Sequence, residues 1–506
     1  MHSFKKGCTF NSLEDIKDKK ITVMGLGLNG GGEACVRFFL NHGAYVTVTD
    51  MKTAEQLKPT IDRLENDANL DTTRLTYVLG EHRIEDFKNA DCVIKNPGVK
   101  IEGNKFLSCA KNIESDISIF LHFTKAPIIA VTGSKGKSST VSAINYGLNQ
   151  AGYKAFLGGN ITVSPLTFLE QTTEETPVVL ELSSWQLADL RGRGALKPHI
   201  SIITKIVPDH QNWYGNMEDY VADKRLIYAD QTKGEYTIVD YDGDETGTGP
   251  KKGGTWGDFF AKETKGTVLR YSRTKPDLLK GFYGVWQETD QKGNTVGMVL
   301  LPGMDSPEQI MGELSVPGSH MKTNALNAAL VLFLMQVESD KIIKILQSWP
   351  GIDHRLQFFH SYKNNKFYND SCATVPEAAS CASQSFGKPV ILATGGTDKG
   401  LSFEPLIKTL TSDGKDGTIL PSKIFLLAGT GTDKLTPSLD SKGISYEGPF
   451  DSLDKMLHSI KNYLDSCNLS DQIIVFSPGA TSFGMFANEF DRGNKFMNGV
   501  KELFEN

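Results

Sequence analysis

A glycine- and lysine-rich loop could bind phosphate groups. TGSKGKSS (132–139) follows an apolar run and precedes a helical pattern, so backbone amides and a helix N-terminus can cradle phosphates there. Lys137 would bridge the terminal phosphates, and Ser138 would offer an oxygen to Mg²⁺. The match to a P-loop is incomplete, because Val131 stands where the pattern has glycine. The loop predicts a nucleotide site, with a solvated Gly/Ser/Lys turn as the alternative.

Two residues after apolar runs could bind a metal ion. Glu181 closes the run PVVLE (177–181), and an acid at the tip of a strand beside a P-loop strand is placed to bind Mg²⁺ or orient water. His210 lies just past the run ISIITKIV (200–207). The alternatives are an exposed acid at a strand end and a structural histidine.

Lys224 lies within an apolar helical pattern. If 219–230 is helical, the residues three and four positions away are apolar or aromatic: Tyr220, Val221, Ile227 and Tyr228. The amine would then project from an apolar face, where burial pushes lysine toward its neutral form. A neutral amine near a metal can act as a nucleophile, including by capturing CO₂ as a carbamate. The alternative is a packed stem whose charged head reaches solvent.

A second glycine loop, GLGLNG (25–30), matches G-x-G-x-x-G between an apolar run and a helical pattern, and Asp50 ends the next predicted strand. This context is typical of dinucleotide sites. Amides at a helix N-terminus can approach any diphosphate closely, and a UDP-sugar offers the same group. NAD(P), another nucleotide diphosphate and a structural turn all remain open here.

The last third of the chain has four polar clusters at predicted loops or strand ends. They are DHR (353–355), NDSCAT (369–374), GGTDK (395–399) and SPGATSF (477–483). Together they place Arg, Lys, Ser and Thr donors around the ligand edge of a sheet, which suits phosphate and a small dicarboxylate.

The elements that position these motifs alternate between strands and helices, which predicts an α/β fold with mostly parallel sheets. We predict three domains, 1–116, 117–350 and 351–506. The third contains four strand-like runs, and each of these runs ends in small or polar residues. The segment 231–315 interrupts the rhythm, and we expect surface excursions and short strands there.

The composition narrows the class of protein. The chain has 506 residues and a net charge of -6, which does not favour nucleic-acid binding. Its seven cysteines include no C-x-x-C pair, so a disulfide framework is not indicated. The N-terminus lacks the apolar core of a signal peptide, and no run is long enough to span a bilayer. We therefore expect a cytoplasmic protein without membrane insertion.

The ordered set of motifs resembles the Mur ligases, the ATP-dependent amino-acid ligases of peptidoglycan synthesis. The resemblance runs from GLGLNG through TGSKGKSS, ELSSWQL, DHQNWYG, YVADKRLIY, HMKTNALNAA and NDSCAT to SPGATSF and FDRGNKF. It implies Rossmann-like N- and C-terminal domains around a central P-loop ATPase-like domain. ELSSWQL and SPGATSF are most similar to members that add D-glutamate to UDP-N-acetylmuramoyl-L-alanine through an acyl phosphate. A monomer is expected.

The resemblance also implies site residues. The UDP substrate would contact Gly25, Leu28, Asn29, Gly30, Asp50, Asn96, Gly98 and Asn160. ATP would contact Gly133, Ser134, Lys135, Gly136, Lys137, Ser138, Ser139, Asn324, Arg355 and Asp370. Two Mg²⁺ ions would be bound by Ser138, Glu181, His210 and a carbamylated Lys224. D-glutamate would contact Thr374, Lys399, Ser482 and Phe483. Lys137, Lys224 and His210 are the expected catalytic residues.

Some positions depart from the family pattern. Cys372 stands where N-D-S-K-A-T has lysine, and Met321 replaces the asparagine common after His320. The alternatives are a Mur ligase for L-glutamate or L-alanine, a non-catalytic binding relative, and an NAD-binding oxidoreductase. The oxidoreductase alternative gives the Gly136-Lys137-Ser138 loop no role.

Overall fold

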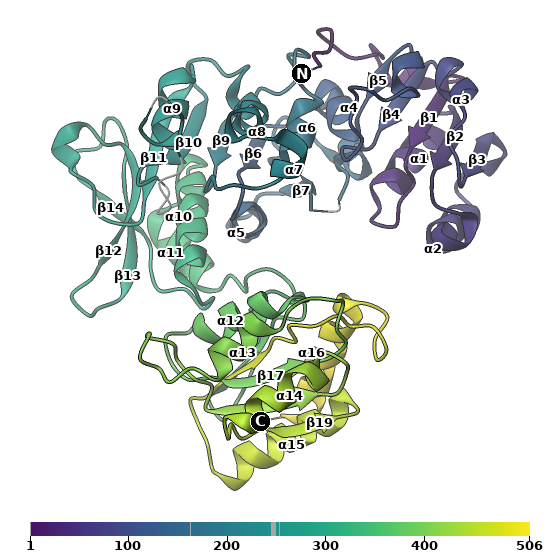
Figure 1. Cartoon of the computed structure of the whole chain (residues 1–506). Coiled ribbons are helices and arrows are strands. Elements are labelled where there is room, and N and C mark those ends of the chain that lie inside the picture. Colours follow the sequence, from purple (N-terminus) through teal and green to yellow (C-terminus); the bar gives the residue numbers. More distant parts are fainter. Residues whose placement is uncertain (1, 162, 244–248, 252, 506) are drawn as a thin grey trace. The chain divides into compact units, whose positions relative to one another are not determined.

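Three β-sheets organise the protein (Figure 1). The structure is a computed structural model, and it describes residues 2–161, 163–243, 249–251 and 253–505. Contacts divide the chain into two units, one formed by 1–312 with 323–346 and the other by 313–322 with 347–506. The predicted α/β fold class is confirmed, whereas the domain boundaries at 116 and 350 stay predictions.

The first sheet is wholly parallel, in the order β3-β2-β1-β4-β5. Its strands are β1 (Lys20–Met24), β2 (Tyr45–Asp50), β3 (Leu75–Leu79), β4 (Cys92–Lys95) and β5 (Ile113–Glu114). Its helices are α1 (Gly31–Asn41), α2 (Ala54–Glu65), α3 (Ile84–Lys88) and α4 (Asp116–Phe123). The strand order reverses between β1 and β4, and open α/β sheets bind ligands beyond the carboxyl ends of strands at such a switch point.

The second sheet has nine strands, in the order β14-β13-β12-β11-β10-β9-β6-β8-β7. They are β6 (Ile128–Thr132), β7 (Phe156–Gly159), β8 (Val178–Glu181), β9 (Ile200–Ile203), β10 (Tyr236–Asp240), β11 (Thr267–Ser272), β12 (Gly284–Thr289), β13 (Thr295–Leu300) and β14 (Glu308–Met311). The helices that follow these strands are α5 (Lys137–Ala151), α6 (Ser184–Ala188), α7 (Gln211–Tyr214), α8 (Met217–Lys224), α9 (Trp256–Glu263), α10 (Ser319–Leu334) and α11 (Ser339–Gln347). Every residue of β6 is buried, as expected for a central parallel strand.

The segment 231–315 differs from the expected surface excursions. β10, β11 and β12 continue the parallel part of the second sheet, and β13 and β14 extend it through antiparallel pairing at the edge opposite β7 (Figure 1). The expectation of short strands is confirmed. The sequence did not indicate that these strands join the second sheet, because charged and glycine-rich turns obscure the strand pattern between them, and residues 244–248 and 252 of this segment lie outside the described residues.

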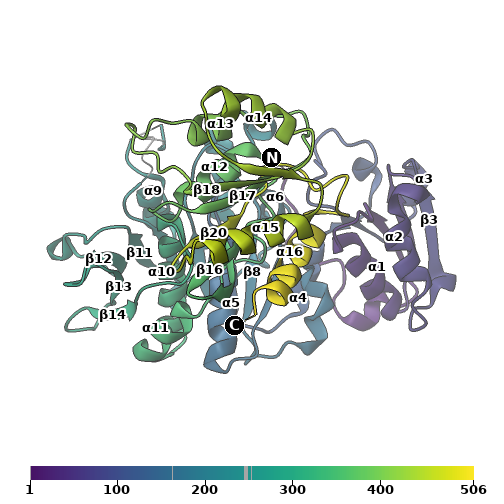
Figure 2. The same ribbon diagram turned by 90° about the horizontal axis from the view of Figure 1, so that it is seen from below.

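The third sheet is covered by helices on both faces (Figure 2). Its order is β15-β16-β20-β17-β18-β19, with strands β15 (Gln357–Tyr362), β16 (Asn365–Asn369), β17 (Ile391–Gly395), β18 (Lys423–Leu427), β19 (Glu447–Phe450) and β20 (Ile473–Phe476). Its helices are α12 (Pro376–Gln384), α13 (Glu404–Leu410), α14 (Thr432–Ser441), α15 (Leu453–Ser466) and α16 (Glu489–Leu503). Phe425 packs with α15 and α16, while the next residue, Leu426, packs with α12 to α14, because successive strand side chains point to opposite faces.

Two buried ion pairs join the first sheet to the second. Arg193 Nη1 lies 2.8 Å from Glu114 Oε2, and Lys95 Nζ lies 2.9 Å from Asp189 Oδ2. All four side chains are buried. Removing one partner of such a pair leaves an uncompensated buried charge, which costs about 3–5 kcal/mol.

The seven cysteines are free, as the sequence predicts. Within the described residues, we find no helix with the length and apolarity that crossing a membrane requires.

Candidate functional site

The predicted P-loop connects β6 to α5. Lys137, the first residue of α5, donates from Nζ to the carbonyl oxygens of Gly133 (3.0 Å) and Ser134 (3.1 Å). Burial lowers the pKa of Lys137, and the nearby carboxylate of Glu181 opposes that shift. A Cβ on Gly133 would lie 1.9 Å from Thr204 Oγ1, so this turn packs too tightly for any side chain. The loop thus holds one ammonium group and the N-terminus of a long helix at the end of β6.

Other predicted ATP contacts gather around the same loop. Asn324 is buried on α10, and its Oδ1 atom would lie 2.6 Å from a Cβ on Gly136. Ser134 bonds to Val207 O (2.9 Å) and to the Tyr220 hydroxyl (3.0 Å). Lys135 is exposed, whereas Ser138 and Ser139 are half-buried in the first turn of α5. The structure therefore brings Asn324 beside the loop, although almost 190 residues separate it from Gly136 in sequence.

Lys224 is the last residue of α8, and its side chain is 2% exposed. The expected helix over 219–230 is only partly α-helical, because a 3-10 helix follows over Arg225–Tyr228. Its Nζ donates to Gly133 O at 2.7 Å and lies 4.6 Å from the centre of the Tyr220 ring. Burial lowers the pKa of Lys224 well below its ordinary value, and the neighbouring Lys137 lowers it further. Burial of the amine against the P-loop therefore favours its neutral form.

Glu181, at the end of β8, carries a buried carboxylate with one bonded and one unbonded oxygen. Oε1 accepts from Asn160 Nδ2 at 2.8 Å, while Oε2 has no hydrogen-bond partner among the described residues. A buried carboxylate oxygen without a partner is costly unless a cation binds it. The residue types fit a magnesium ion, which prefers oxygen ligands and retains several waters. Among the described residues, no group of three or more His, Cys, Asp or Glu side chains is placed to hold a metal ion by itself.

His210 precedes α7 in a left-handed backbone conformation, with φ of 51°. Its ring packs 4.9 Å from the Trp185 ring and 6.2 Å from the Tyr220 ring, measured between centroids. Tyr220 also contacts Lys224, so His210 lies on the same side of the P-loop as the buried amine.

A cleft of about 510 Å³ opens at the switch point of the first sheet. It is lined after β1 by Gly25, Leu28 and Asn29, after β4 by Asn96, and from the second sheet by Asn160 and Gln186. Asn96 packs 3.4 Å from the position of a Cβ on Gly25 and accepts from Gly98 N at 3.0 Å. Asn160 also binds Glu181, so this residue connects the cleft to the P-loop region.

Asp50 stabilises the first glycine loop. Its Oδ2 accepts from the amides of Leu26 (3.0 Å) and Gly27 (3.1 Å), and its Oδ1 accepts from Lys52 N (2.9 Å). Gly30 caps α1 with φ of 87°, a left-handed conformation that favours glycine. Both Asp50 oxygens thus hold backbone, and a contact from Asp50 to the UDP substrate stays a prediction.

In the third sheet, three predicted loops meet at one edge, because β16, β20 and β17 are parallel neighbours. Lys399 Nζ lies 3.4 Å from Thr374 Oγ1, which joins the loops after β17 and β16. Thr397 Oγ1 donates to Phe483 O at 2.6 Å, which joins the loops after β17 and β20. Ser482 is buried, whereas the Phe483 side chain is 67% exposed. The four predicted amino-acid contacts therefore lie in one loop cluster.

Arg492 on α16 was missed as a site residue in the sequence. Its side chain is fully buried and donates to Ser371 O (2.7 Å), Ser371 Oγ (3.0 Å) and Ala480 O (2.9 Å). It thereby links the loops after β16 and β20. The available signal was the buried face of α16, since Phe496 and Val500, four and eight residues later, mark it as apolar.

Asp370 lies at the end of β16 and is nearly buried. It accepts from Leu356 N at 3.1 Å and from Ser477 Oγ at 2.6 Å. Burial raises the pKa of Asp370 to about 7, and Arg355, which is exposed, partly offsets that shift.

This raised pKa predicts a pH-dependent stability that Asp370→Asn removes. The pKa of this carboxyl group is higher in the folded protein than in the unfolded chain, so the folded protein binds the proton more tightly. The contribution of Asp370 to stability therefore falls as the pH rises from about 4 to 7. Between pH 5 and 7, we expect the free energy of unfolding to fall by about 1–2 kcal/mol more in the wild type than in the variant. Urea unfolding checks this, with the exposed Asp353→Asn as the control. Parallel profiles for wild type and Asp370→Asn would contradict it.

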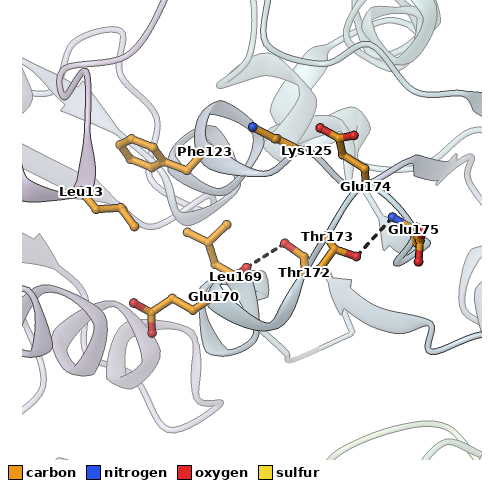
Figure 3. A pocket seen from close by; sticks show the side chains of 9 residues that line it. All are labelled: Leu13, Phe123, Lys125, Leu169, Glu170, Thr172, Thr173, Glu174 and Glu175. Carbon is orange, nitrogen blue, oxygen red and sulfur yellow. Dashed lines mark hydrogen bonds between the residues drawn. The ribbon is translucent and has the colours of Figure 1, made fainter.

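A further hollow of about 610 Å³ lies away from these motifs (Figure 3). Its lining residues are Leu13, Phe123, Lys125, Leu169, Glu170, Thr172, Thr173, Glu174 and Glu175. Three glutamates outnumber one lysine there, so this hollow does not suit phosphate groups.

Comparison with known proteins identifies the class. Residues 19–118 match the family description "Mur ligase MurD-like, N-terminal domain", and residues 131–332 match "Mur ligase middle domain". The Treponema pallidum (strain Nichols) protein named UDP-N-acetylmuramoylalanine--D-glutamate ligase is 38% identical, with 97% of this chain and 99% of that protein covered. This chain belongs to the Mur ligase family.

Two further proteins extend the comparison. A protein of the same name from Borreliella burgdorferi (strain ZS7) is also 38% identical, over 97% of this chain and 99% of its own length. The crystal structure of the UDP-N-acetylmuramate-alanine ligase MurC from Thermotoga maritima shares 16% identity at a TM-score of 0.54, with 96% of this chain and 99% of that chain covered. That likeness supports the three-domain α/β architecture.

Proposed function

We propose that this protein joins D-glutamate to UDP-N-acetylmuramoyl-L-alanine, converting ATP to ADP and phosphate. The observation that carries the proposal is that Asn160 connects the switch-point cleft to Glu181 beside the P-loop. A long substrate held in the cleft can thereby present its far end to the γ-phosphate of ATP. The 38% identity to proteins named as D-glutamate ligases, over 97% of this chain, supports this choice of amino acid.

The reaction transfers an acyl group in two steps. The L-alanine carboxylate of the substrate attacks the γ-phosphate, which gives an acyl phosphate and ADP. The amine of D-glutamate then attacks the acyl carbon, phosphate leaves, and the nitrogen loses a proton to form the amide. Lys137 would leave its two loop carbonyls for the phosphate oxygens and stabilise the charge that builds up on them. Ser134, Gly136 and Asn324 would hold the nucleotide around it.

Mg²⁺ held by residues beside the P-loop would supply neutralisation of phosphate charge. Glu181 is the strongest ligand candidate, because its Oε2 is buried without a described hydrogen-bond partner. Ser138 and His210 lie near the same loop and complete the proposed set with Lys224. In its neutral form, which burial favours, the Lys224 amine can attack CO₂, forming a carbon–nitrogen bond and releasing a proton to water, which would add a second carboxylate-like ligand.

D-glutamate would bind in the loop cluster of the third sheet. Lys399 is the only lysine or arginine in NDSCAT, GGTDK and SPGATSF, since Cys372 replaces the lysine of the family pattern. Burial raises the pKa of Cys372, so its thiol adds no charge near neutral pH.

Lys399→Ala should therefore weaken amino-acid binding selectively. A charge-assisted hydrogen bond contributes about 1.5–3 kcal/mol, so we expect the KM for D-glutamate to rise about 10–100-fold. The KM for ATP should stay within about twofold. Initial rates of phosphate release measure both constants, with the exposed Lys408→Ala on α13 as the control. An unchanged KM for D-glutamate would exclude Lys399 from the site.

The function itself is tested by phosphate release from the purified protein with ATP, Mg²⁺ and UDP-N-acetylmuramoyl-L-alanine. D-glutamate, L-glutamate, L-alanine and meso-diaminopimelate are compared, and the mass of each product is measured. We expect turnover with D-glutamate alone. Turnover with another amino acid would keep the mechanism and change the substrate. Absence of turnover with all four amino acids would favour a non-catalytic relative.

A further inference from the structure

The switch-point cleft contains an acidic side chain to which the proposed reaction gives no role. Asp116 is the first residue of α4 and lines the cleft. Among the described lining residues it is the only acid, and Lys52 and Lys95 are the only cations. Lys95 is bonded to Asp189 Oδ2 at 2.9 Å and to three backbone carbonyls, so much of its hydrogen-bonding capacity is used within the protein.

The contacts of Asp116 leave it able to accept further hydrogen bonds. Oδ2 accepts from the buried Ser164 hydroxyl at 2.7 Å, and Oδ1 accepts from Ile117 N at 2.9 Å. Each carboxylate oxygen has two lone pairs, so each can accept one more bond. Burial raises the pKa of Asp116, while the bond from Ser164 favours the charged form.

A carboxylate in this cleft has an electrostatic cost. The ligand proposed for the cleft carries a diphosphate, and like charges at short range weaken binding, more so at a partly buried site. Asp116 therefore improves binding only if it accepts from a neutral donor on the ligand. A nucleotide-sugar offers such donors as hydroxyl groups and as an amide N–H.

The location of Asp116 selects among these donors. The diphosphate is proposed to bind at the glycine loop and the N-terminus of α1. Asp116 is bonded to Ser164, which follows β7 and lines the cleft together with Asn160 and Gln186. Asn160 contacts Glu181, so this side of the cleft leads toward the reacting end of the substrate. The part of the ligand between the diphosphate and the reacting carboxylate is the N-acetylated sugar.

We propose that Asp116, held by Ser164, is a specificity residue that accepts a hydrogen bond from a hydroxyl or amide N–H of that sugar. The proposal rests on the proposed function for the identity of the ligand. Asp116 would thereby discriminate between ligands, because a site built to accept a hydrogen bond from a substrate donor binds analogues that lack this donor poorly.

The test is the affinity of full-length Asp116→Asn for UDP and for UDP-N-acetylmuramoyl-L-alanine, measured by calorimetry. We expect the Kd for the full substrate to rise about 10–100-fold, as for loss of a charge-assisted bond, while the Kd for UDP stays within about threefold. Asp258→Asn, which alters a first-turn acid of α9 outside the cleft, is the matched control and should change neither. UDP binding also reports whether the cleft remains folded.

Two further ligands identify the donor. If Asp116→Asn loses affinity for both UDP-glucose and UDP-N-acetylglucosamine, the donor is a sugar hydroxyl. If it loses affinity for UDP-N-acetylglucosamine alone, the donor is the amide N–H. Equal weakening of UDP and the full substrate, or no change in either, would overturn the proposal. If the wild-type protein bound neither ligand, the cleft assignment would fail first, which separates that failure from an incorrect role for Asp116.

Discussion

Lys137→Ala should lower the rate of phosphate release by about 10³-fold or more at saturating substrates. Removing one group that stabilises developing charge at an enclosed site typically costs about 10²–10³-fold, and cations on transferring phosphoryl groups contribute up to about 10⁵-fold. The Lys137 ammonium is half-buried against two loop carbonyls, and burial lowers its pKa. A bound triphosphate would favour the charged form, so the interaction of the ammonium group with phosphate strengthens as charge develops on the phosphate oxygens.

The measurement is the steady-state rate with ATP, Mg²⁺, UDP-N-acetylmuramoyl-L-alanine and D-glutamate. Lys197→Ala is the control, because Lys197 is an exposed lysine of the same unit that pairs with Glu235 at 3.3 Å. We expect the control to retain turnover within about twofold. Turnover of Lys137→Ala within tenfold of the wild type would refute the phosphate role of this residue.

Lys224→Ala should lose activity by about 10³-fold and regain part of it in acetate or formate. The Lys224 side chain occupies a buried position against Gly133, and burial lowers its pKa, which favours the neutral, nucleophilic amine. If the amine binds CO₂ and the resulting carbamate binds Mg²⁺, alanine removes a ligand and leaves space for a small carboxylate. Large losses on removing a metal ligand or its partner are expected.

Rescue distinguishes this role from simple packing. Rates are measured against the concentrations of acetate and formate, and a ¹³C carbamate signal is sought in wild-type protein supplied with labelled bicarbonate. Lys137→Ala serves as the matched variant, since its defect should not respond to carboxylates. Full activity of Lys224→Ala, or a defect that no carboxylate relieves, would exclude the carbamate.

The α/β class and the strands that carry the motifs could be predicted from the sequence. Buried parallel strands are continuous apolar runs, and β6, β8 and β9 have that pattern. The short strands expected in 231–315 are present, but they are not surface excursions, because β10 to β14 extend the second sheet one after another in sequence order. The charged and glycine-rich turns between these strands leave little trace of that pairing in the local composition.

The sequence by itself determined the local chemistry: the P-loop at 132–139, the strand-end acid Glu181 and the apolar environment of Lys224. Each depends on spacing within a few residues, which helical and strand periodicity convert directly into geometry. Only the tertiary structure decided which groups these residues meet. Asn160 binds Glu181, Asp50 holds the glycine loop, and Arg492 ties two loops together across more than 100 residues. Such contacts arise when parallel strands bring their carboxyl ends to one edge, and the order of strands in a sheet is a property of the whole chain.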